Sequence, residues 1–114
     1  MMARWFMAAT LFLASAGLAA AQGKGIRFWN LATATVSALQ FSPAGKDSWG
    51  PNQTANDKDG EIEHDERLRI SDLEPGRYDV KVRYRDKREC LVRNVEIKAN
   101  AVFSIADKDL MDCK

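Results

Sequence analysis

Histidine and cysteine are scarce in this chain, and their scarcity excludes several kinds of site. The 114 residues include one histidine, His64, and two cysteines, Cys90 and Cys113. A zinc centre made of two histidines, or of two cysteine pairs, is therefore not expected. The two cysteines also lie too far apart in sequence for a Cys-x-x-Cys redox site. No serine or cysteine nucleophile stands in a recognisable motif with His64, so we expect a surface histidine and no enzymatic activity.

The first 21 residues have the pattern of a cleavable secretory signal peptide. Residues 1–4 carry one positive charge, residues 5–18 are uncharged and largely apolar, and residues 19–21 are small alanines. The apolar run is shorter than the roughly 20 residues that a membrane-spanning helix needs. A membrane anchor or a buried N-terminal helix is the alternative, but the rest of the chain offers no apolar partner face. The single Arg4 favours the general secretory route over the twin-arginine route.

Residues 22–114 have the size of one small domain. The chain has 17 Lys and Arg against 16 Asp and Glu, and loss of Arg4 with the signal peptide would balance the two. Balanced charge indicates no attraction to nucleic acid or to an acidic membrane surface. In a small exported domain, an even number of cysteines predicts one disulfide, here Cys90–Cys113. The predicted location is periplasmic or secreted.

Short alternating segments separated by turn residues dominate residues 22–114. Residues 78–84 are the clearest case, because tyrosine and valine alternate there with charged side chains. No long segment has the 3.6-residue period of a helix, although residues 107–114 are compatible with a helical turn that carries Cys113. We therefore predict an all-β fold, a small antiparallel β-sandwich of transthyretin-like or immunoglobulin-like type. Its expected strands are residues 25–31, 35–41, 67–70, 78–84, 89–98 with a bulge near Arg93 and Asn94, and 102–105.

A loop rich in aspartate and glutamate is the sharpest chemical feature of the sequence. With Gly60 at position six of a calcium loop, Asp57 and Asp59 fall at positions three and five, and Glu66 falls at position twelve. Position one, however, is Ala55, and the flanking residues do not indicate helices. A solvated acidic turn is thus the simpler interpretation. The candidate calcium ligands are Asp57, Asp59, Glu61 and Glu66, and no other cofactor is indicated.

A basic segment follows in residues 77–93, which hold seven basic and three acidic side chains. Lys81, Arg83 and Arg85 are expected on the solvent face of the strand, where they could bind an anion or a partner protein. The alternative is that they pair with the acidic loop and provide a charged sheet edge that discourages aggregation.

The Trp49-Gly50-Pro51 turn offers a rigid aromatic side chain near that basic strand. An exposed indole could stack on a sugar or on a side chain of a partner. We favour the alternative, in which the ring folds back and plugs one end of the sandwich. Trp29 is either turned into the core by a bulge or exposed. The candidate binding surface is Trp49, Lys81, Arg83 and Arg85.

Several stretches resemble a group of small exported proteins of Gram-negative bacteria, namely residues 39–45, 47–52, 56–60, 75–81 and 92–97. Some members carry a twin-arginine-signal label and others an argininosuccinate lyase label. The second label does not fit here, because such lyases resemble large helical enzymes. Residues 73–82 are also similar to the Leu-x-Pro-Gly-x-Tyr-x-Val stretch of carboxypeptidase regulatory-like and transthyretin-like sandwiches. This similarity implies a fold and no function.

These features together predict an exported binding or interaction module without catalytic activity. Its partner would be a protein or a small ligand, and we expect no nucleic-acid partner and no membrane attachment after signal cleavage. The alternative is a calcium-stabilised structural domain of the cell envelope that uses residues 57–66.

Overall fold

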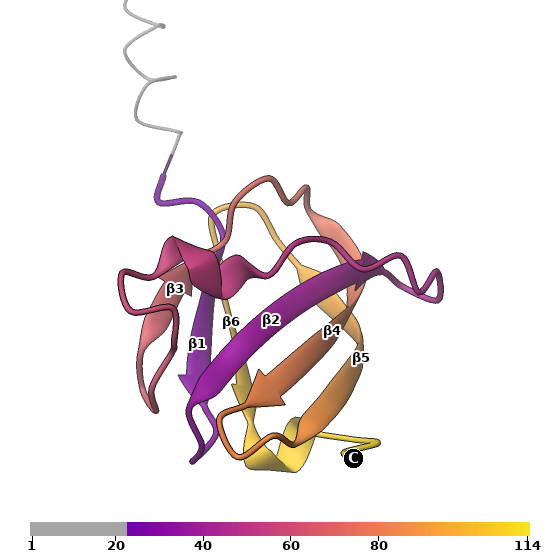
Figure 1. Ribbon diagram of the computed structural model, residues 1–114. Helices are drawn as coiled ribbons and strands as arrows, with labels where there is room; N and C mark the ends of the chain where they lie inside the picture. The colour runs from indigo at the N-terminus through magenta and orange to yellow at the C-terminus, as the bar shows by residue number, and fades with distance from the viewer. Residues whose placement is uncertain (1–22) are drawn as a thin grey trace, which may run out of the picture.

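A computed structural model describes residues 23–114 of the protein (Figure 1). The predicted signal peptide, residues 1–21, lies outside the described residues. Within residues 23–114, no helix is long and apolar enough to cross a membrane.

The described residues form an all-β domain, as the alternating sequence pattern predicts. Each strand lies where the sequence placed one, with small differences at its ends. The strands are β1 (Arg27–Leu31), β2 (Val36–Pro43), β3 (Arg67–Arg69), β4 (Gly76–Tyr84), β5 (Glu89–Ile97) and β6 (Val102–Ala106), and two 3₁₀ turns are η2 (Gln53–Asn56) and η3 (Asp107–Asp109).

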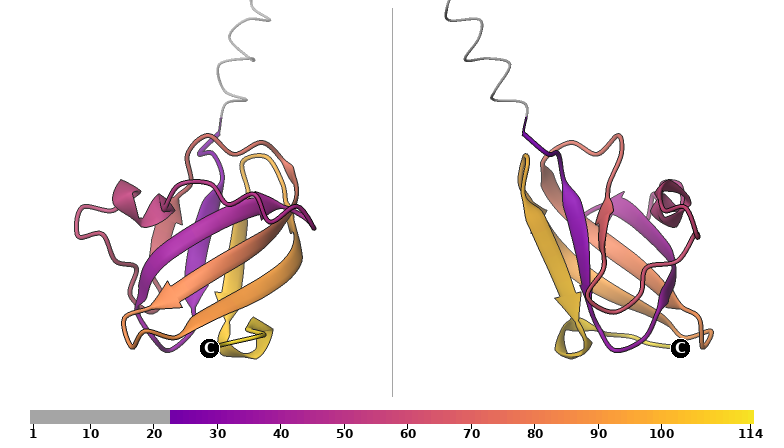
Figure 2. Two further views of the ribbon diagram at one scale, coloured as in Figure 1. Left: turned by 45° about the vertical axis from the view of Figure 1, so that its right-hand side comes forward. Right: turned by 90° about the vertical axis from the view of Figure 1, so that its left-hand side faces the viewer.

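The strands form two three-stranded sheets that pack face to face (Figure 2). Their orders are β3-β1-β6 and β2-β4-β5. Three of the four pairings are antiparallel, but β1 and β6 are parallel, with Arg27 opposite Val102. Because β5 and β6 belong to different sheets, the chain crosses between the sheets after Ile97 and enters β6 at the end where β1 also begins. The predicted antiparallel β-sandwich is thus confirmed, with one parallel pair of strands in it.

The core lies between the inner faces of the two sheets. Val80, Val82 and Tyr84 of β4 are buried, which confirms the inner face predicted from their alternation. Phe103 of β6 contacts aromatic rings of both sheets. Its ring centroid lies 5.5 Å from that of Phe28 in β1 and 5.7 Å from that of Phe41 in β2. Each fully buried aliphatic or aromatic side chain in this core, such as Val80 or Phe28, stabilises the fold by roughly 1.5–3 kcal/mol.

The C-terminal tail is fastened to the edge of β5. Cys90 and Cys113 form the predicted disulfide, with their Cα atoms 4.0 Å apart. Leu91 and Met111 exchange backbone hydrogen bonds of 2.8 and 2.9 Å. The expected helical turn is shorter than residues 107–114, because η3 ends at Asp109 and the remaining tail instead pairs with β5.

Candidate functional site

Trp49 lies on the outer face of the β2-β4-β5 sheet, beside Lys81 of β4. The Nζ atom of Lys81 is 4.4 Å from the centroid of the indole ring. Lys81 points outward because its neighbours Val80 and Val82 point into the core. The indole is half-buried and is not part of the core. The favoured interpretation of Trp49 as a plug of the sandwich is therefore wrong, and the ring is available at the surface.

Hydrogen bonds to β2 hold the loop that carries Trp49. The backbone N–H of Gly50 donates to the carbonyl of Phe41 at 2.9 Å. The N–H of Ser48 donates to the hydroxyl oxygen of Ser42 at 2.8 Å. Both neighbours of Trp49 are thus tied to one strand, which fixes where the ring lies.

A pocket of about 210 Å³ lies beside the Trp49 ring. It is formed by the loop after β2, by β4 and β5, and by the C-terminal tail. Besides Trp49 and Lys81, its lining residues are Asp47, Glu89, Leu91, Asp112 and Lys114. An indole, an aliphatic side chain and charged groups of both signs therefore surround one small space. We call this site the Trp49–Lys81 pocket.

Arg83 and Arg85 extend the same face of β4, but each is paired with a carboxylate. Arg83 lies 3.5 Å from Glu89, which also lines the pocket. Arg85 points instead to Glu61, and Nη2 and Oε1 are 2.5 Å apart. The hydrogen bond from Arg85 holds the pKa of the Glu61 carboxyl below its usual value. Of the four candidate surface residues, the structure brings Trp49 and Lys81 together, pairs Arg83 with Glu89 of the pocket lining and directs Arg85 away.

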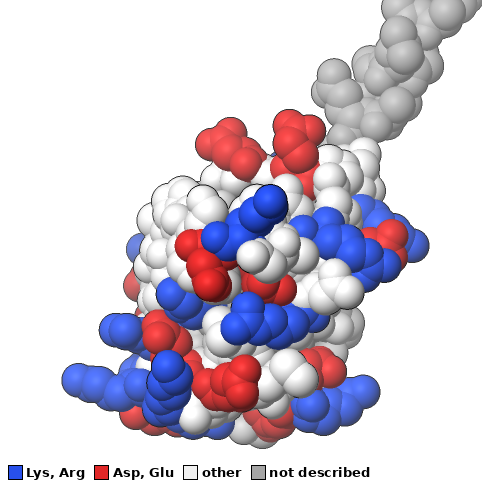
Figure 3. Space-filling model, turned by 90° about the vertical axis from the view of Figure 1, so that its right-hand side faces the viewer, with Lys and Arg blue, Asp and Glu red and all other residues white. Residues whose placement is uncertain are grey.

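Other basic side chains of residues 77–93 are also paired. Arg77 lies 3.7 Å from Glu96, and Arg88 lies 3.3 Å from Asp86. Figure 3 shows the resulting mixture of blue and red side chains over the face on the β5 side. This face has no broad patch of a single sign, so its charges are better suited to pairing than to binding a polyanion.

The candidate calcium ligands are not brought together. The carboxylate of Asp57 accepts the N–H of Asp59 at 2.8 Å, Glu61 faces Arg85, and Glu66 accepts the N–H of Glu63 at 2.7 Å. Within residues 23–114, no three His, Cys, Asp or Glu side chains are placed to hold a metal ion.

The backbone of the acidic loop instead has the geometry of a turn. Gly60 has a φ of 73°, a conformation that favours glycine, and its N–H donates to the carbonyl of Asp57 at 3.1 Å. The simpler interpretation of this segment, a solvated acidic turn in which Gly60 serves the turn, agrees with this geometry.

His64 and Trp29 have structural contacts on the other sheet's side of the domain. His64 is exposed, and its Nδ1 atom lies 2.8 Å from the carbonyl oxygen of Ala32. Trp29 is half-buried, donates from Nε1 to Asp65 at 2.9 Å and lies under the guanidinium of Arg67, 4.1 Å from the ring centroid. Trp29 is therefore outside the core, held by side chains of the segment that ends in β3.

Asp79 is the residue that sequence reasoning missed. The alternation of residues 78–84 predicted a solvent-facing carboxylate, yet Asp79 is only 2% exposed. Its oxygens accept the N–H groups of Gly45 and Asn94, both at 2.9 Å, and Nη1 of Arg93 at 3.1 Å. These bonds, led by that from Gly45, lower the pKa of the Asp79 carboxyl.

The predicted bulge in β5 explains why Asp79 can be buried. The register between β4 and β5 shifts at this point, and Asn94 has a φ of 57°. The shift turns the Asn94 N–H toward Asp79, while the turn after β2 brings Gly45 over it. The sequence signal that could have revealed this site is an aspartate in β4 that lies opposite the bulge predicted in β5.

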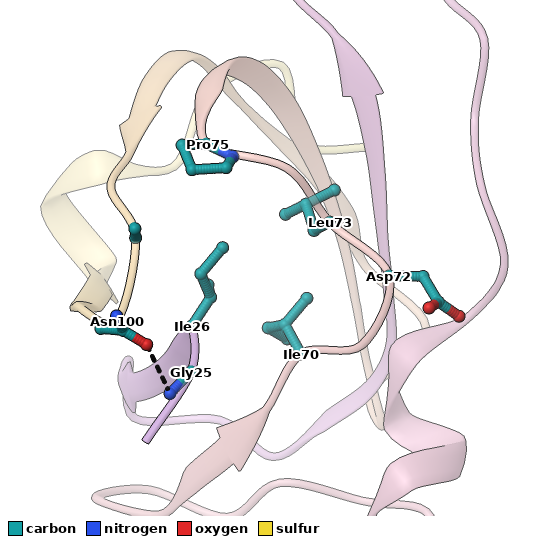
Figure 4. Close-up of a pocket in the computed structure, with 8 residues that line it drawn as sticks. Gly25, Ile26, Ile70, Asp72, Leu73, Pro75 and Asn100 are labelled. Atoms are coloured by element: carbon teal, nitrogen blue, oxygen red, sulfur yellow. Dashed lines mark hydrogen bonds between the residues drawn. The ribbon is translucent and has the colours of Figure 1, made fainter. Parts of the chain in front are cut away.

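A second cavity, of about 240 Å³, lies at the end of the sandwich where the described chain begins. Ile26, Ile70, Leu73 and Pro75 surround it, whereas Asp72 points away (Figure 4). Asn100 also lines this cavity, but its Oδ1 atom already accepts the Gly25 N–H at 3.1 Å. The cavity is therefore an open end of the core and has little with which to orient a polar ligand.

Comparison of the chain with family models, with curated proteins and with solved structures finds no match.

Proposed function

We propose that this protein is an exported binding module without catalytic activity, and that its ligand site is the Trp49–Lys81 pocket. The observation that carries the proposal is the half-buried indole of Trp49 at the wall of a pocket lined by charged groups of both signs. Aromatic rings combine a large apolar surface with low conformational freedom, so they anchor ligands well.

The chemistry of the lining favours a small ligand with one apolar face and a polar rim. Leu91 and the indole provide apolar surface, while Asp47, Asp112 and Lys114 provide hydrogen-bond acceptors and donors. A saccharide ring has this combination of an apolar face and hydroxyl groups. We therefore propose a saccharide as the ligand class.

The pocket has supports on two sides, which favours binding without rearrangement. Asp79 holds the Gly45 turn at the base of the Trp49 loop. The Cys90–Cys113 disulfide holds the tail that contributes Asp112. A site that is fixed before binding loses less conformational entropy when the ligand arrives.

Two features support the proposed export. The signal-like pattern of residues 1–21 supports passage across a membrane. The disulfide supports maturation in an oxidising compartment, since such bonds rarely persist in the cytosol. The likeness to small exported proteins of Gram-negative bacteria agrees with both, and the periplasm is the location we propose.

The test is saccharide binding by protein secreted from cells that express the full chain. Neutral, amino and acidic saccharides would be titrated while indole fluorescence and ¹⁵N–¹H chemical shifts are recorded. We expect shifts at Trp49 and Lys81, and Trp49→Ala should weaken binding by about tenfold or more, since the ring is a main contact.

Trp29→Phe is the matched control, because Trp29 is also half-buried under a basic side chain but lies on the other sheet. This variant should bind as the wild type does. Absence of binding by every saccharide, or binding that Trp49→Ala leaves unchanged, would contradict the proposal.

A further inference from the structure

The four sheet edges of the domain differ in how their backbone groups are covered. The β2 edge is covered by side chains of the following loop. There, Asn52 accepts the N–H of Leu39 at 2.9 Å, and the Thr54 hydroxyl donates to the carbonyl of Ser37 at 3.3 Å. A strand from another chain cannot pair with groups that are already used.

The β3 and β5 edges are protected by other means. β3 has only three residues, of which Arg67 and Arg69 are exposed, and Asn56 donates to the Arg69 carbonyl at 2.9 Å. β5 pairs with the tail through Leu91 and Met111, and a bulge interrupts the rest of it. Short length, charge, bulges and covering segments are the common protections of sheet edges.

Among the residues that the structure describes, nothing gives the β6 edge any of these protections. Its residues, Val-Phe-Ser-Ile-Ala, include no charge and no proline, and its pairing with β1 has no register shift. In Figure 2 (right), β6 is the outermost strand of its sheet. The strand is also regular over its full length, which makes it a suitable template for another strand.

The parallel register with β1 fixes which backbone groups of β6 are free. The N–H of Arg27 donates to the carbonyl of Ala101 at 3.0 Å. In a parallel ladder with that bond, Phe103 and Ile105 direct their N–H and C=O groups toward β1. Val102 and Ser104 therefore direct theirs to the open side, and within residues 23–114 no further hydrogen bond reaches them.

A groove of about 230 Å³ runs beside this free edge, between β5 and β6. Ile97 and Phe103 give it apolar walls, and Val102 at its side is 37% exposed. Glu96 and Lys98 give it a rim with both signs of charge. A strand added to β6 would place every second side chain toward this groove.

We propose that the β6 edge binds an extended segment of another polypeptide as an added strand, with one aliphatic side chain in the groove. The groove argues against a second copy of this chain as the occupant. In a β6–β6 pair, the side chains on the groove side would be Phe103 and Ile105 of the second copy, and these belong to its own core, where Ile105 is 1% exposed. An unfolded segment has no core of its own, so its side chains are free to enter the groove.

The test is selection of a random linear peptide library on protein secreted from cells expressing the full chain. Selected peptides should shift the amide signals of residues 102–106. Ser104→Pro removes the outward N–H and should weaken binding by about tenfold or more, whereas the matched Ser104→Ala keeps the N–H and should bind normally.

A second variant keeps the test decisive if Ser104→Pro fails to fold. Val102→Lys adds a charge at an exposed position of the edge and should also abolish peptide binding. Three outcomes would overturn the proposal: no peptide selected, selected peptides that bind Val102→Lys as well as the wild type, or a wild-type dimer in sedimentation that Val102→Lys dissociates. The last outcome would assign the edge to a second copy. Because β6 lies outside the Trp49–Lys81 pocket, failure here leaves the proposed saccharide site intact.

Discussion

Asp79 shows at the scale of one residue how a sequence pattern can mislead. Its place in the alternation of β4 predicts exposure, and this holds for Arg83, which is exposed. At Asp79 the alternation still gives the correct face, but a turn and a bulge cover that face. Such covering segments come from distant parts of the chain, so the local pattern carries little information about them.

Asp79→Ala should lower the free energy of unfolding by about 3 kcal/mol at neutral pH, because two backbone N–H groups and the Arg93 guanidinium lose their buried acceptor. Urea denaturation measures this loss. A loss below about 0.5 kcal/mol, as at an ordinary surface site, would show that the hydrogen bonds to Asp79 contribute little.

The same carboxylate predicts part of the acid sensitivity of the domain. The folded-state pKa of Asp79 is lowered, so its stabilisation is present above the unfolded-state pKa of about 3.9 and is lost as the pH falls through the folded-state value. Asp79→Ala should therefore lose less stability than the wild type when the pH falls below about 4. Equal losses in the two proteins would contradict this account.

Tyr84 contrasts with Asp79, because within residues 23–114 its buried hydroxyl oxygen has no hydrogen-bond partner. Its side chain is 1% exposed. Burial raises the pKa of Tyr84 to about 12. Tyr84→Phe should therefore raise the free energy of unfolding by about 1 kcal/mol.

The raised pKa also gives Tyr84 an alkaline signature. Ionisation is easier in the unfolded chain, whose tyrosine pKa is about 10, so the wild type loses stability between about pH 10 and 12. Tyr84→Phe should lose less over that range. If the variant is less stable than the wild type at neutral pH, the hydroxyl has a stabilising partner after all.

At the scale of elements, the positions of the strands could be predicted from local sequence. Alternation of tyrosine and valine with charged side chains located β4. The parallel β1–β6 pairing could not be predicted in this way, because it depends on which sheet each strand joins. The position of Trp49 depends similarly on bonds between its loop and β2. The separation of Asp57 from Glu66 depends on the partners that each carboxylate finds.

The disulfide and the C-terminal tail act as one element. Replacing both cysteines by alanine should lower the free energy of unfolding by about 3 kcal/mol, as expected for a loop of this length. It should also speed amide exchange at Leu91 and Met111, whose mutual hydrogen bonds hold the tail on β5. Wild-type protein with its disulfide reduced is the control and should behave in the same way. Unchanged exchange at both amides would show that the tail stays in place without the disulfide.

The acidic loop makes a prediction about metal. Because Asp57, Glu61 and Glu66 face separate partners, the melting temperature should be the same with added calcium as with a chelator. Differential scanning fluorimetry measures this directly. A rise in melting temperature that depends on calcium concentration, and that disappears in Glu66→Gln, would restore the calcium-stabilised alternative.

At the scale of the whole molecule, the N-terminal sequence, the disulfide and the open sheet edge support a single proposal. A leader-like segment precedes a β domain whose C-terminal tail lines the pocket and is joined to β5 by a disulfide. Within the described part of the chain, residues 23–114, the regular β6 edge is open, while the three other sheet edges are covered or charged. We infer a small envelope protein that is cleaved, oxidised and then used as a scaffold for binding.

Intact-mass and N-terminal analysis of the protein recovered from cells that express the full chain tests this account most directly. We expect a chain that begins at Gln22, found outside the cytoplasm, with the mass of one closed disulfide. A cytosolic chain that retains residues 1–21 and has both Cys90 and Cys113 as free thiols would contradict it.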